Sequence, residues 1–349
     1  MRPVYLLLFL LITAAAFGQK NNKVVLVIHG GAGTILKSQM TPEKEAAYNK
    51  ALTLALQKGY DTLIKGGSAL DAVEISVRIL EDNPLFNAGK GSVFTSEGKN
   101  EMDAAIMNGE TLAAGSIAGV TTIKNPISAA RAVMEKSPHV MLAGKGAETF
   151  AGSVGLEIVA PSYFYTEERW QALQKVKKQE EKERMENRKK EMLADTALNK
   201  KTGLQQTENR DYKYGTVGAV ALDIKGNLAA ATSTGGMTNK KYGRIGDAPL
   251  IGAGTYANNR SCAVSCTGWG EYFIRLVMAK SVGDLMEYKN LSVEKASEDM
   301  ILNKLPALGG DGGLIALDKD GNFSMPFNTA GMYRGYIKDG KAVVKIYKD

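Results

Sequence analysis

Apolar and polar stretches alternate along the chain at the lengths of strands and helices. A continuous apolar run at residues 23–28 has strand length, and the flexible glycines of His29–Gly33 predict a turn directly after it. Apolar positions at helical spacing favour a helix over residues 43–64. Ser68, followed three residues later by Asp71, is typical of the first turn of a second helix.

The remaining pattern predicts further strands, several of them joined as hairpins. Helices are predicted at 128–136, 271–279 and 293–305, and strands at 102–107, 111–120, 216–222, 228–232, 261–267, 312–317 and 323–325. Short polar turns rich in Asp, Gly and Asn connect strand 216–222 to strand 228–232, and strand 312–317 to strand 323–325. Clusters of strands flanked by helices predict sheets packed between helix layers, an α/β architecture.

Residues 166–214 differ from the rest of the chain in composition, because nearly half of them are charged. The segment has helix-forming residues but little apolar stripe, so we predict a solvent-exposed excursion rather than core. Part of the formal net charge of +7 lies here, which leaves the remainder close to neutral. We therefore expect no nucleic-acid partner.

Residues 1–18 have the pattern of a secretory signal peptide. Arg2 precedes an apolar run, and small residues precede a plausible cleavage point after Gly18. The uncharged stretch is at the lower length limit for crossing a bilayer, so we expect a removed signal rather than a membrane anchor. The protein is then exported, to a periplasm or out of the cell, with no membrane attachment after signal removal.

Several common site types are disfavoured by the composition. Two histidines, His29 and His139, leave little scope for a histidine metal site or a Ser-His-Asp triad. The segment His29–Gly33 resembles an esterase oxyanion loop, but no serine has glycine at both −2 and +2, so the matching nucleophile elbow is missing. The two cysteines, Cys262 and Cys266, lie in one predicted strand, too far apart for a disulfide.

The junction between Gly215 and Thr216 is a candidate catalytic position, because a polar segment ends there and an apolar strand begins. A threonine hydroxyl is a weak nucleophile without a base. Cleavage of this peptide bond would give Thr216 a free α-amine with a pKa of about 8, suited to act as a base for its own hydroxyl. Gly-Thr before a strand is also common without any chemistry, so an ordinary strand start stays open.

The chain is similar to the plant-type asparaginase and isoaspartyl peptidase family of N-terminal-nucleophile hydrolases, over residues 24–160 and 215–336. The similarity lies in His29–Gly33, Asn83–Gly91, Met102–Ala104, Gly215–Ala221, Thr232–Met237, Gly243–Asp247 and Cys266–Glu271. It implies a four-layer αββα sandwich. Residues 19–215 and 216–349 would form an alpha and a beta subunit within one domain, and two such pairs would form a dimer.

The resemblance also implies catalytic roles. Thr216 is the nucleophile, exposed by autocatalytic cleavage after Gly215, and Thr234 forms a hydrogen bond with its hydroxyl. Thr267 and Gly268 supply a hydroxyl and a backbone N–H as the oxyanion hole. A half-buried strand threonine without a catalytic role is the alternative for Thr234.

Substrate contacts follow from the same resemblance. Arg244 binds the α-carboxylate and Asp247 the α-amino group of an amino-acid head. Gly268 and Gly270 keep the wall of the oxyanion hole free of side chains, and Asn87 lies near the nucleophile. The spacing of Arg244 and Asp247 is also that of an ordinary surface ion pair. Trp269 stands where the family has a small residue, so we expect a narrower or rearranged pocket.

One metal site is implied by the resemblance, and no cofactor is expected for catalysis. In the family a loop holds a structural sodium through backbone carbonyls, which here are those of Leu80, Glu81, Asn83, Phe86, Ala88 and Lys90. Carbonyl oxygens suit such a hard cation. A loop without metal stays open.

The implied reaction is hydrolysis of L-asparagine and of isoaspartyl (β-aspartyl) dipeptides, with release of L-aspartate. Small molecules of this kind are the expected partners. Two alternatives remain at this point: a glycosylasparaginase-type hydrolase, and a non-catalytic periplasmic amino-acid-binding protein on the same fold.

Overall fold

The computed structural model describes residues 24–194 and 215–348, and of residues 191–194 only the backbone. The predicted signal peptide, residues 1–18, lies outside the described residues, as does the last part of the charged segment, residues 195–214.

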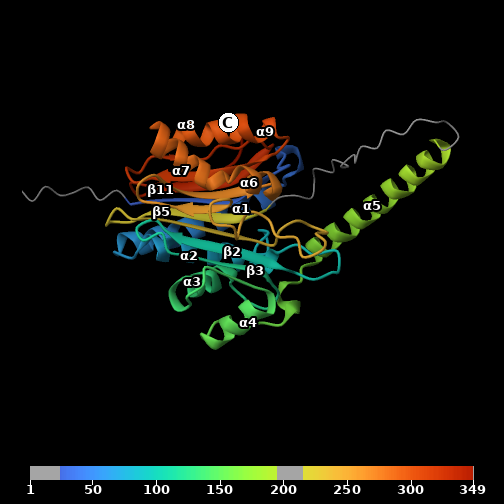
Figure 1. The fold of residues 1–349 in the computed structure, drawn as a ribbon, viewed down its shortest axis with the longest axis horizontal. Coiled ribbons are helices and arrows are strands. Elements are labelled where there is room, and N and C mark those ends of the chain that lie inside the picture. Colours follow the sequence, from blue (N-terminus) through green and yellow to red (C-terminus); the bar gives the residue numbers. More distant parts are fainter. Residues whose placement is uncertain (1–23, 195–214, 349) are drawn as a thin grey trace, which may run out of the picture.

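Two sheets face one another in the centre of the described part (Figure 1). The larger has the strand order β12 (Lys341–Tyr347), β11 (Gly331–Lys338), β1 (Val25–Gly33), β5 (Val217–Leu222), β6 (Leu228–Thr234), β2 (Met102–Asn108), β3 (Ala114–Val120) and β4 (Met141–Ala143). The smaller has the order β10 (Phe323–Ser324), β9 (Gly312–Asp318), β8 (Cys262–Gly268) and β7 (Thr255–Ala257). Neighbouring strands are antiparallel, except for the parallel pair β3–β4.

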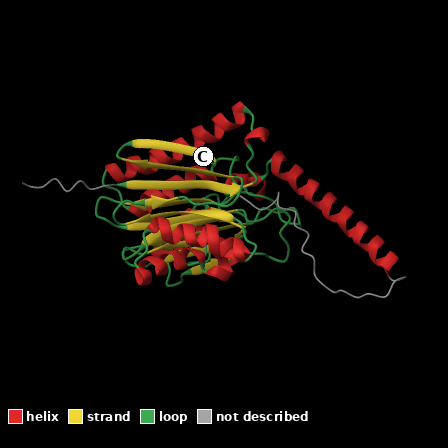
Figure 2. Ribbon diagram, turned by 90° about the horizontal axis from the view of Figure 1, so that it is seen from above, coloured by secondary structure: helices red, strands yellow, loops and turns green. Residues whose placement is uncertain are grey.

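Helices cover the outer faces of both sheets (Figures 1 and 2). The larger sheet is covered by α1 (Pro42–Ile64), α2 (Ala69–Glu81) and α3 (Pro126–Lys136), with α4 (Gly144–Ser153) beside β3 and β4. The smaller sheet is covered by α6 (Gly270–Leu276), α7 (Met278–Lys289), α8 (Val293–Glu298) and α9 (Leu305–Ala307). Strands β1, β5 and β6 contact β8 and β9 across the middle. The predicted four-layer αββα sandwich is confirmed.

Strand β1 is apolar on both faces because both of its faces are covered. Leu26 and Ile28 pack into the core cluster shared with α1 and α2. Val25 and Val27 point the other way, into the cluster between the two sheets. Successive side chains of a strand alternate between faces, so a central strand of a layered protein reads as one continuous apolar run.

The turn predicted at His29–Gly33 is wrong, because β1 continues to Gly33 and pairs with β11 along this part. The register shifts between His29 and Gly31, as in a β-bulge. Gly31 has φ +111°, and a Cβ there would lie 2.7 Å from the Cα of Gly215. The glycines therefore permit close packing against another segment rather than a chain reversal.

Three further differences concern the end of one helix, the geometry of another and two strands that were not predicted. The helix expected over 271–279 ends at Leu276, and α7 begins after Val277, which has a left-handed backbone conformation. The helix expected over 293–305 contains a π-helical segment at Asp299–Lys304. Strands β11 and β12 have no counterpart in the sequence prediction, which ended with the hairpin before them.

Helix α5 (Glu167–Ala194) leaves the body of the molecule and projects from it (Figures 1 and 2). Its beginning is nevertheless packed, since Leu173 and Val176 are buried and the Trp170 ring lies 5.3 Å from that of Phe94. Further along, the Glu180 carboxylate accepts hydrogen bonds from Asn239 and Lys241, both at 2.8 Å. The expected exposed excursion therefore begins only after Glu180, where the described side chains are mostly exposed.

Cys262 and Cys266 are both buried in β8 and free of disulfide, as the strand spacing predicts. Burial raises the pKa of the Cys262 thiol to about 12 and also raises that of Cys266. Both therefore stay protonated near neutral pH and behave as small core residues.

Candidate active site

Thr216 lies at the start of β5, in the middle of the larger sheet. Because β5 pairs with β1 on one side and β6 on the other, residues from both strands reach it. The Thr216 hydroxyl donates a hydrogen bond to the hydroxyl of Thr234, at the end of β6, at 3.1 Å. Only 8% of Thr216 is exposed. Its hydroxyl is thus held in one direction in a nearly closed environment.

Gly215 occupies a narrow space just before the strand. Its φ is +149°, and a Cβ on it would collide with the side chain of Asn87. On the other side, the space for a Cβ on Gly31 is filled by the backbone of Gly215. Only glycine fits between these neighbours, so the peptide unit before Thr216 is closely confined.

Asn87 lies beside this junction, as the family resemblance implies, and its side chain is fixed at both ends. The amide Nδ2 donates to the carbonyl oxygen of Gly236 at 2.8 Å, and Oδ1 accepts from the backbone N–H of Val93 at 3.0 Å. The Gly236 N–H donates in turn to the hydroxyl of Thr234 at 2.9 Å. Asn87 and Thr234 therefore belong to one hydrogen-bonded group with the segment after β6.

Thr267 and Gly268 lie at the end of β8, in the smaller sheet. The buried Thr267 hydroxyl accepts a hydrogen bond from the backbone N–H of Ala32 at 3.2 Å. Gly268 has φ +152°, and a Cβ there would lie 2.5 Å from the carbonyl oxygen of Asp311. Since Ala32 follows the glycine that packs on Gly215, the end of β1 connects Thr267 with the Gly215–Thr216 junction.

Arg244, Asp247 and Gly270 come together in one place. A Cβ on Gly270 would lie 2.8 Å from Asp247 Oδ1 and 3.0 Å from Arg244 Nη2. Arg244 does not form the ordinary ion pair with Asp247, because its Nε and Nη2 donate to both carboxylate oxygens of Glu271, at 2.9 and 2.8 Å. These residues form a charged cluster, in which Asp247 and Arg244 occupy the space that a side chain at Gly270 would need.

The carboxyl group of Asp247 is buried, and one of its oxygens lacks a partner. Among the described residues, no hydrogen-bond donor reaches its Oδ2. Burial raises the pKa of Asp247 to about 6, an effect opposed by its own backbone N–H and by the charge of Arg244. A buried carboxylate oxygen without a partner is costly, so this position favours a ligand that carries a positive hydrogen-bond donor.

His29 is a site residue whose role the sequence reasoning missed. Its Nδ1–H donates to the carbonyl oxygen of Thr216 at 3.0 Å, and its Nε2 accepts from the hydroxyl of Ser265 at 2.9 Å. Burial lowers the pKa of His29 to about 3, so the ring is neutral near pH 7. A polar ring inside the apolar run of β1 was the available signal for this position.

The loop after α2 carries the backbone carbonyls of the implied sodium site. Gly89 and Gly91 face the carbonyl oxygens of Glu81 and Phe86, and a Cβ on either glycine would strike them. Carbonyls of Leu80, Asn83 and Ala88 accept hydrogen bonds from N–H groups of the same loop. The carbonyls of Glu81 and Phe86 thus lie against glycines rather than side chains, and carbonyl oxygen is a ligand type that fits a hard cation. Within residues 24–194 and 215–348, no group of three His, Cys, Asp or Glu side chains is placed to hold a metal.

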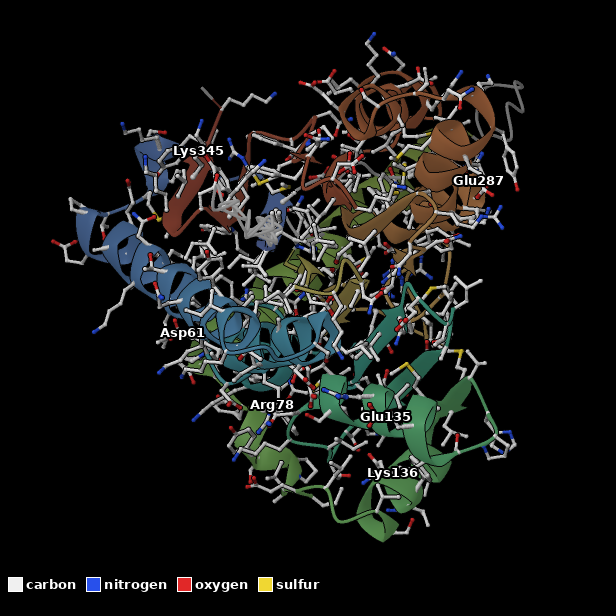
Figure 3. The ribbon with its side chains drawn as sticks, turned by 90° about the vertical axis from the view of Figure 1, so that its left-hand side faces the viewer. Asp61, Arg78, Glu135, Lys136, Glu287 and Lys345 are labelled. Atoms are coloured by element: carbon white, nitrogen blue, oxygen red, sulfur yellow. The ribbon has the colours of Figure 1, made fainter. Side chains whose placement is uncertain are left out.

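A pocket of about 280 Å³ between α2 and α3 has no part in this arrangement. Arg78, Glu135 and Lys136 lie along it (Figure 3), and none of its lining residues is a predicted site residue. Its central guanidinium, that of Arg131, is already paired with Asp71, Glu74 and Glu135.

The fold and the site together define the class of protein. A four-layer αββα sandwich with a threonine at the start of a central strand is the architecture of the N-terminal-nucleophile hydrolases. A match to the family described as "Asparaginase" covers residues 22–346. The chain therefore belongs to the asparaginase family and is an enzyme of the hydrolase class.

Relatives from distant organisms support this assignment. The chain is 52% identical to the isoaspartyl peptidase of Escherichia coli (strain K12), over 91% of this chain and 94% of that protein. It is 51% identical to the isoaspartyl peptidase of Salmonella typhimurium, over 91% and 97%. It is 43% identical to the plant-type L-asparaginase of Pyrococcus abyssi, also over 91% and 97%.

In the described part of the chain, no helix combines the length and apolar character needed to cross a membrane.

Proposed function

We propose that this enzyme cleaves itself between Gly215 and Thr216 and then hydrolyses β-aspartyl dipeptides and L-asparagine, releasing L-aspartate. The observation that carries the proposal is the 3.1 Å hydrogen bond from the Thr216 hydroxyl to Thr234, directly after the confined Gly215. The substrate class is supported by relatives called isoaspartyl peptidase and L-asparaginase, which match this chain over nine-tenths of its length.

The first reaction is self-cleavage. The Thr216 hydroxyl oxygen attacks the carbonyl carbon of Gly215. The peptide C–N bond breaks as the hydroxyl proton passes to the Thr216 nitrogen, and the chain up to Gly215 is held as an ester on Thr216. Water hydrolyses the ester, which leaves a carboxylate on Gly215 and a free α-amine on Thr216. The close packing of Gly215 between Gly31 and Asn87 supports this step, because it limits the carbonyl to few orientations.

Turnover uses the new α-amine as a base for the neighbouring hydroxyl. The Thr216 oxygen attacks the side-chain carbonyl of the substrate, and Thr267 and Gly268 donate hydrogen bonds to the oxyanion. One such donor contributes about 3 kcal/mol in comparable enzymes. The proton held by the amine passes to the leaving nitrogen, and water then releases L-aspartate from the ester.

Arg244 and Asp247 of the charged cluster recognise the amino-acid head. The unpartnered Oδ2 of Asp247 accepts from the substrate α-ammonium group, and the guanidinium of Arg244 binds the α-carboxylate. L-asparagine and β-aspartyl dipeptides carry the same head, so one site serves both. The absence of a side chain at Gly270 lets Asp247 and Arg244 lie close together there.

The remaining assignments complete the proposal. Residues 19–215 and 216–349 are the two subunits of one domain, two such pairs form a dimer, and removal of residues 1–18 accompanies export to a periplasm or the cell exterior. A sodium ion bound by the loop carbonyls of Leu80, Glu81, Asn83, Phe86, Ala88 and Lys90 would stiffen the segment that carries Asn87. It takes no part in the reaction.

The test incubates the purified protein with β-aspartyl-leucine, L-asparagine or N-acetylglucosaminyl-asparagine. Hydrolysis is measured as the release of aspartate and, from L-asparagine, ammonia. The proposal predicts turnover of the first two. Turnover of the sugar-linked substrate alone would instead support a glycosylasparaginase. Binding of amino acids without release of product would support a non-catalytic binding protein.

A further inference from the structure

A cavity lies beside the proposed oxyanion residues, lined by Trp269, which follows Gly268, and by Asp311, whose carbonyl oxygen lies against Gly268. It has a volume of about 380 Å³, and its walls include Thr34, Trp269 and Asp311. Pockets of roughly 300–1,000 Å³ accept small ligands or large parts of them. None of the residues assigned to the aspartyl head, Arg244, Asp247 and Gly270, lines this cavity.

A second cavity lies beside the first and reaches Gly215, the residue before Thr216. This smaller cavity, of about 150 Å³, is lined by Gly215 and by the segment Gly30–Ile35. Gly33 and Thr34 line both cavities. The two cavities are therefore neighbours along the end of β1, the smaller against Gly215 and the larger against Trp269.

Trp269 gives this cavity a large aromatic wall whose position is fixed by its neighbours. Its backbone N–H donates to the carbonyl oxygen of Asp311 at 3.0 Å. The indole meets the ring of Tyr272 edge to face, with centroids 4.9 Å apart. Tyr272 in turn packs on Gly310, where a Cβ would lie 2.8 Å from its ring. The half-buried indole is thus held in place before any ligand arrives.

We propose that this cavity binds the second residue of a β-aspartyl dipeptide, and that Trp269 selects second residues with aromatic or large aliphatic side chains. The inference rests on the proposed function. A dipeptide extends beyond its scissile amide by one whole residue, whereas L-asparagine ends there with an amine. An apolar side chain placed against the indole is removed from water, and aromatic pairs gain further from ring geometry.

The test compares β-aspartyl-phenylalanine with β-aspartyl-glycine, which share the head and the scissile bond and differ only in the second side chain. The wild-type enzyme should prefer the phenylalanine substrate in kcat/KM, and Trp269→Ala should lower this preference by about fivefold or more. A general disturbance of the oxyanion hole affects both substrates alike and cancels in the ratio. The control is Trp170→Phe, which alters the other tryptophan, against Phe94, and should keep the wild-type ratio.

A second measurement does not depend on turnover. The chain has two tryptophans, so Trp170→Phe leaves Trp269 as the single indole. Addition of L-phenylalanine, the expected leaving product, should change its fluorescence in a saturable way, and the same addition should leave the emission of Trp269→Phe unchanged.

The outcomes separate the two proposals. Dipeptide hydrolysis with the same Phe-to-Gly preference in wild type and Trp269→Ala, or an unresponsive Trp269, overturns the subsite and leaves the proposed function standing. Absence of any dipeptide hydrolysis by the processed wild-type enzyme overturns the proposed function and the subsite with it.

Discussion

The guanidinium of Arg244 donates two parallel hydrogen bonds to the carboxylate of Glu271, from Nε at 2.9 Å and from Nη2 at 2.8 Å. This pair fixes the plane of the group proposed to bind the substrate carboxylate. Such two-point pairing is specific to guanidinium, since an ammonium group offers no fork. Glu271 acts here as a positioning residue.

Glu271→Ala should therefore raise KM for L-asparagine about tenfold while kcat changes little, because orientation of the carboxylate-binding group is lost before the chemical step. Steady-state kinetics measure both constants. Glu294→Ala, at an exposed position in α8, is the matched control and should behave as wild type. An unchanged KM in Glu271→Ala would show that the guanidinium is oriented by other contacts.

Asp247 predicts a pH dependence of ligand binding. Its pKa, raised by burial to about 6, leaves it ionised above pH 6 and protonated below. Affinity for the product L-aspartate should fall about tenfold per pH unit below this value, because a protonated carboxyl no longer attracts the α-ammonium group. Calorimetric titration from pH 5 to pH 8 measures this. Asp247→Asn should bind weakly and lose this dependence, and the prediction fails if the two proteins share one pH profile.

His29 predicts a pH dependence of stability. Burial holds its folded-state pKa at about 3, against 6.5 for a free histidine, so between these values the unfolded chain binds a proton that the folded chain does not. This contribution to stability is complete above pH 6.5 and is lost as the pH falls, by about 2 kcal/mol between pH 8 and pH 5.

Urea unfolding at several pH values tests this in a Thr216→Ala background, which keeps the chain in one piece. His29→Asn should remove the contribution, because its amide still donates to residue 216 without binding a proton. His139→Asn changes the other, exposed histidine and should keep the parent slope. Equal slopes in all three proteins would contradict the account of His29.

Thr234 should control the reactivity of Thr216 in both reactions. Thr234→Val removes the hydroxyl that lies 3.1 Å from the nucleophile, and we expect self-cleavage and kcat to fall by roughly 100-fold, the scale of one lost polar contact at a reacting oxygen. Thr234→Ser keeps the hydroxyl and should retain most of both rates. Denaturing gels follow cleavage over time. Matching rates for the Val and Ser variants would mean that Thr234 has a packing role only.

Local signals were sufficient for much of the fold. The capping box of Ser68 and Asp71 forms as predicted, since its partners are three residues apart. The same reasoning failed at His29–Gly33, because the conformation of these glycines is decided by β11 and by Gly215, which are distant in sequence. Strand β11 was missed for a related reason, since it pairs with β1, which is distant in sequence.

The site likewise contains residues that the sequence indicated and contacts that only the structure shows. The candidate residues came from a family resemblance, and the structure places Thr216 beside Thr234, and Arg244 beside Asp247. The hydrogen bond between His29 and the Thr216 carbonyl joins positions 187 residues apart, and no spacing in the sequence indicates it. The Arg244–Glu271 pair, at a separation of 27 residues, was hidden for the same reason.

Intact-mass analysis together with N-terminal sequencing of the purified enzyme tests the central claim most directly. The account predicts two chains, the second beginning at Thr216, and a single uncut chain in an inactive Thr216→Ala variant. An active enzyme whose polypeptide runs unbroken from Gly215 into Thr216 would contradict it.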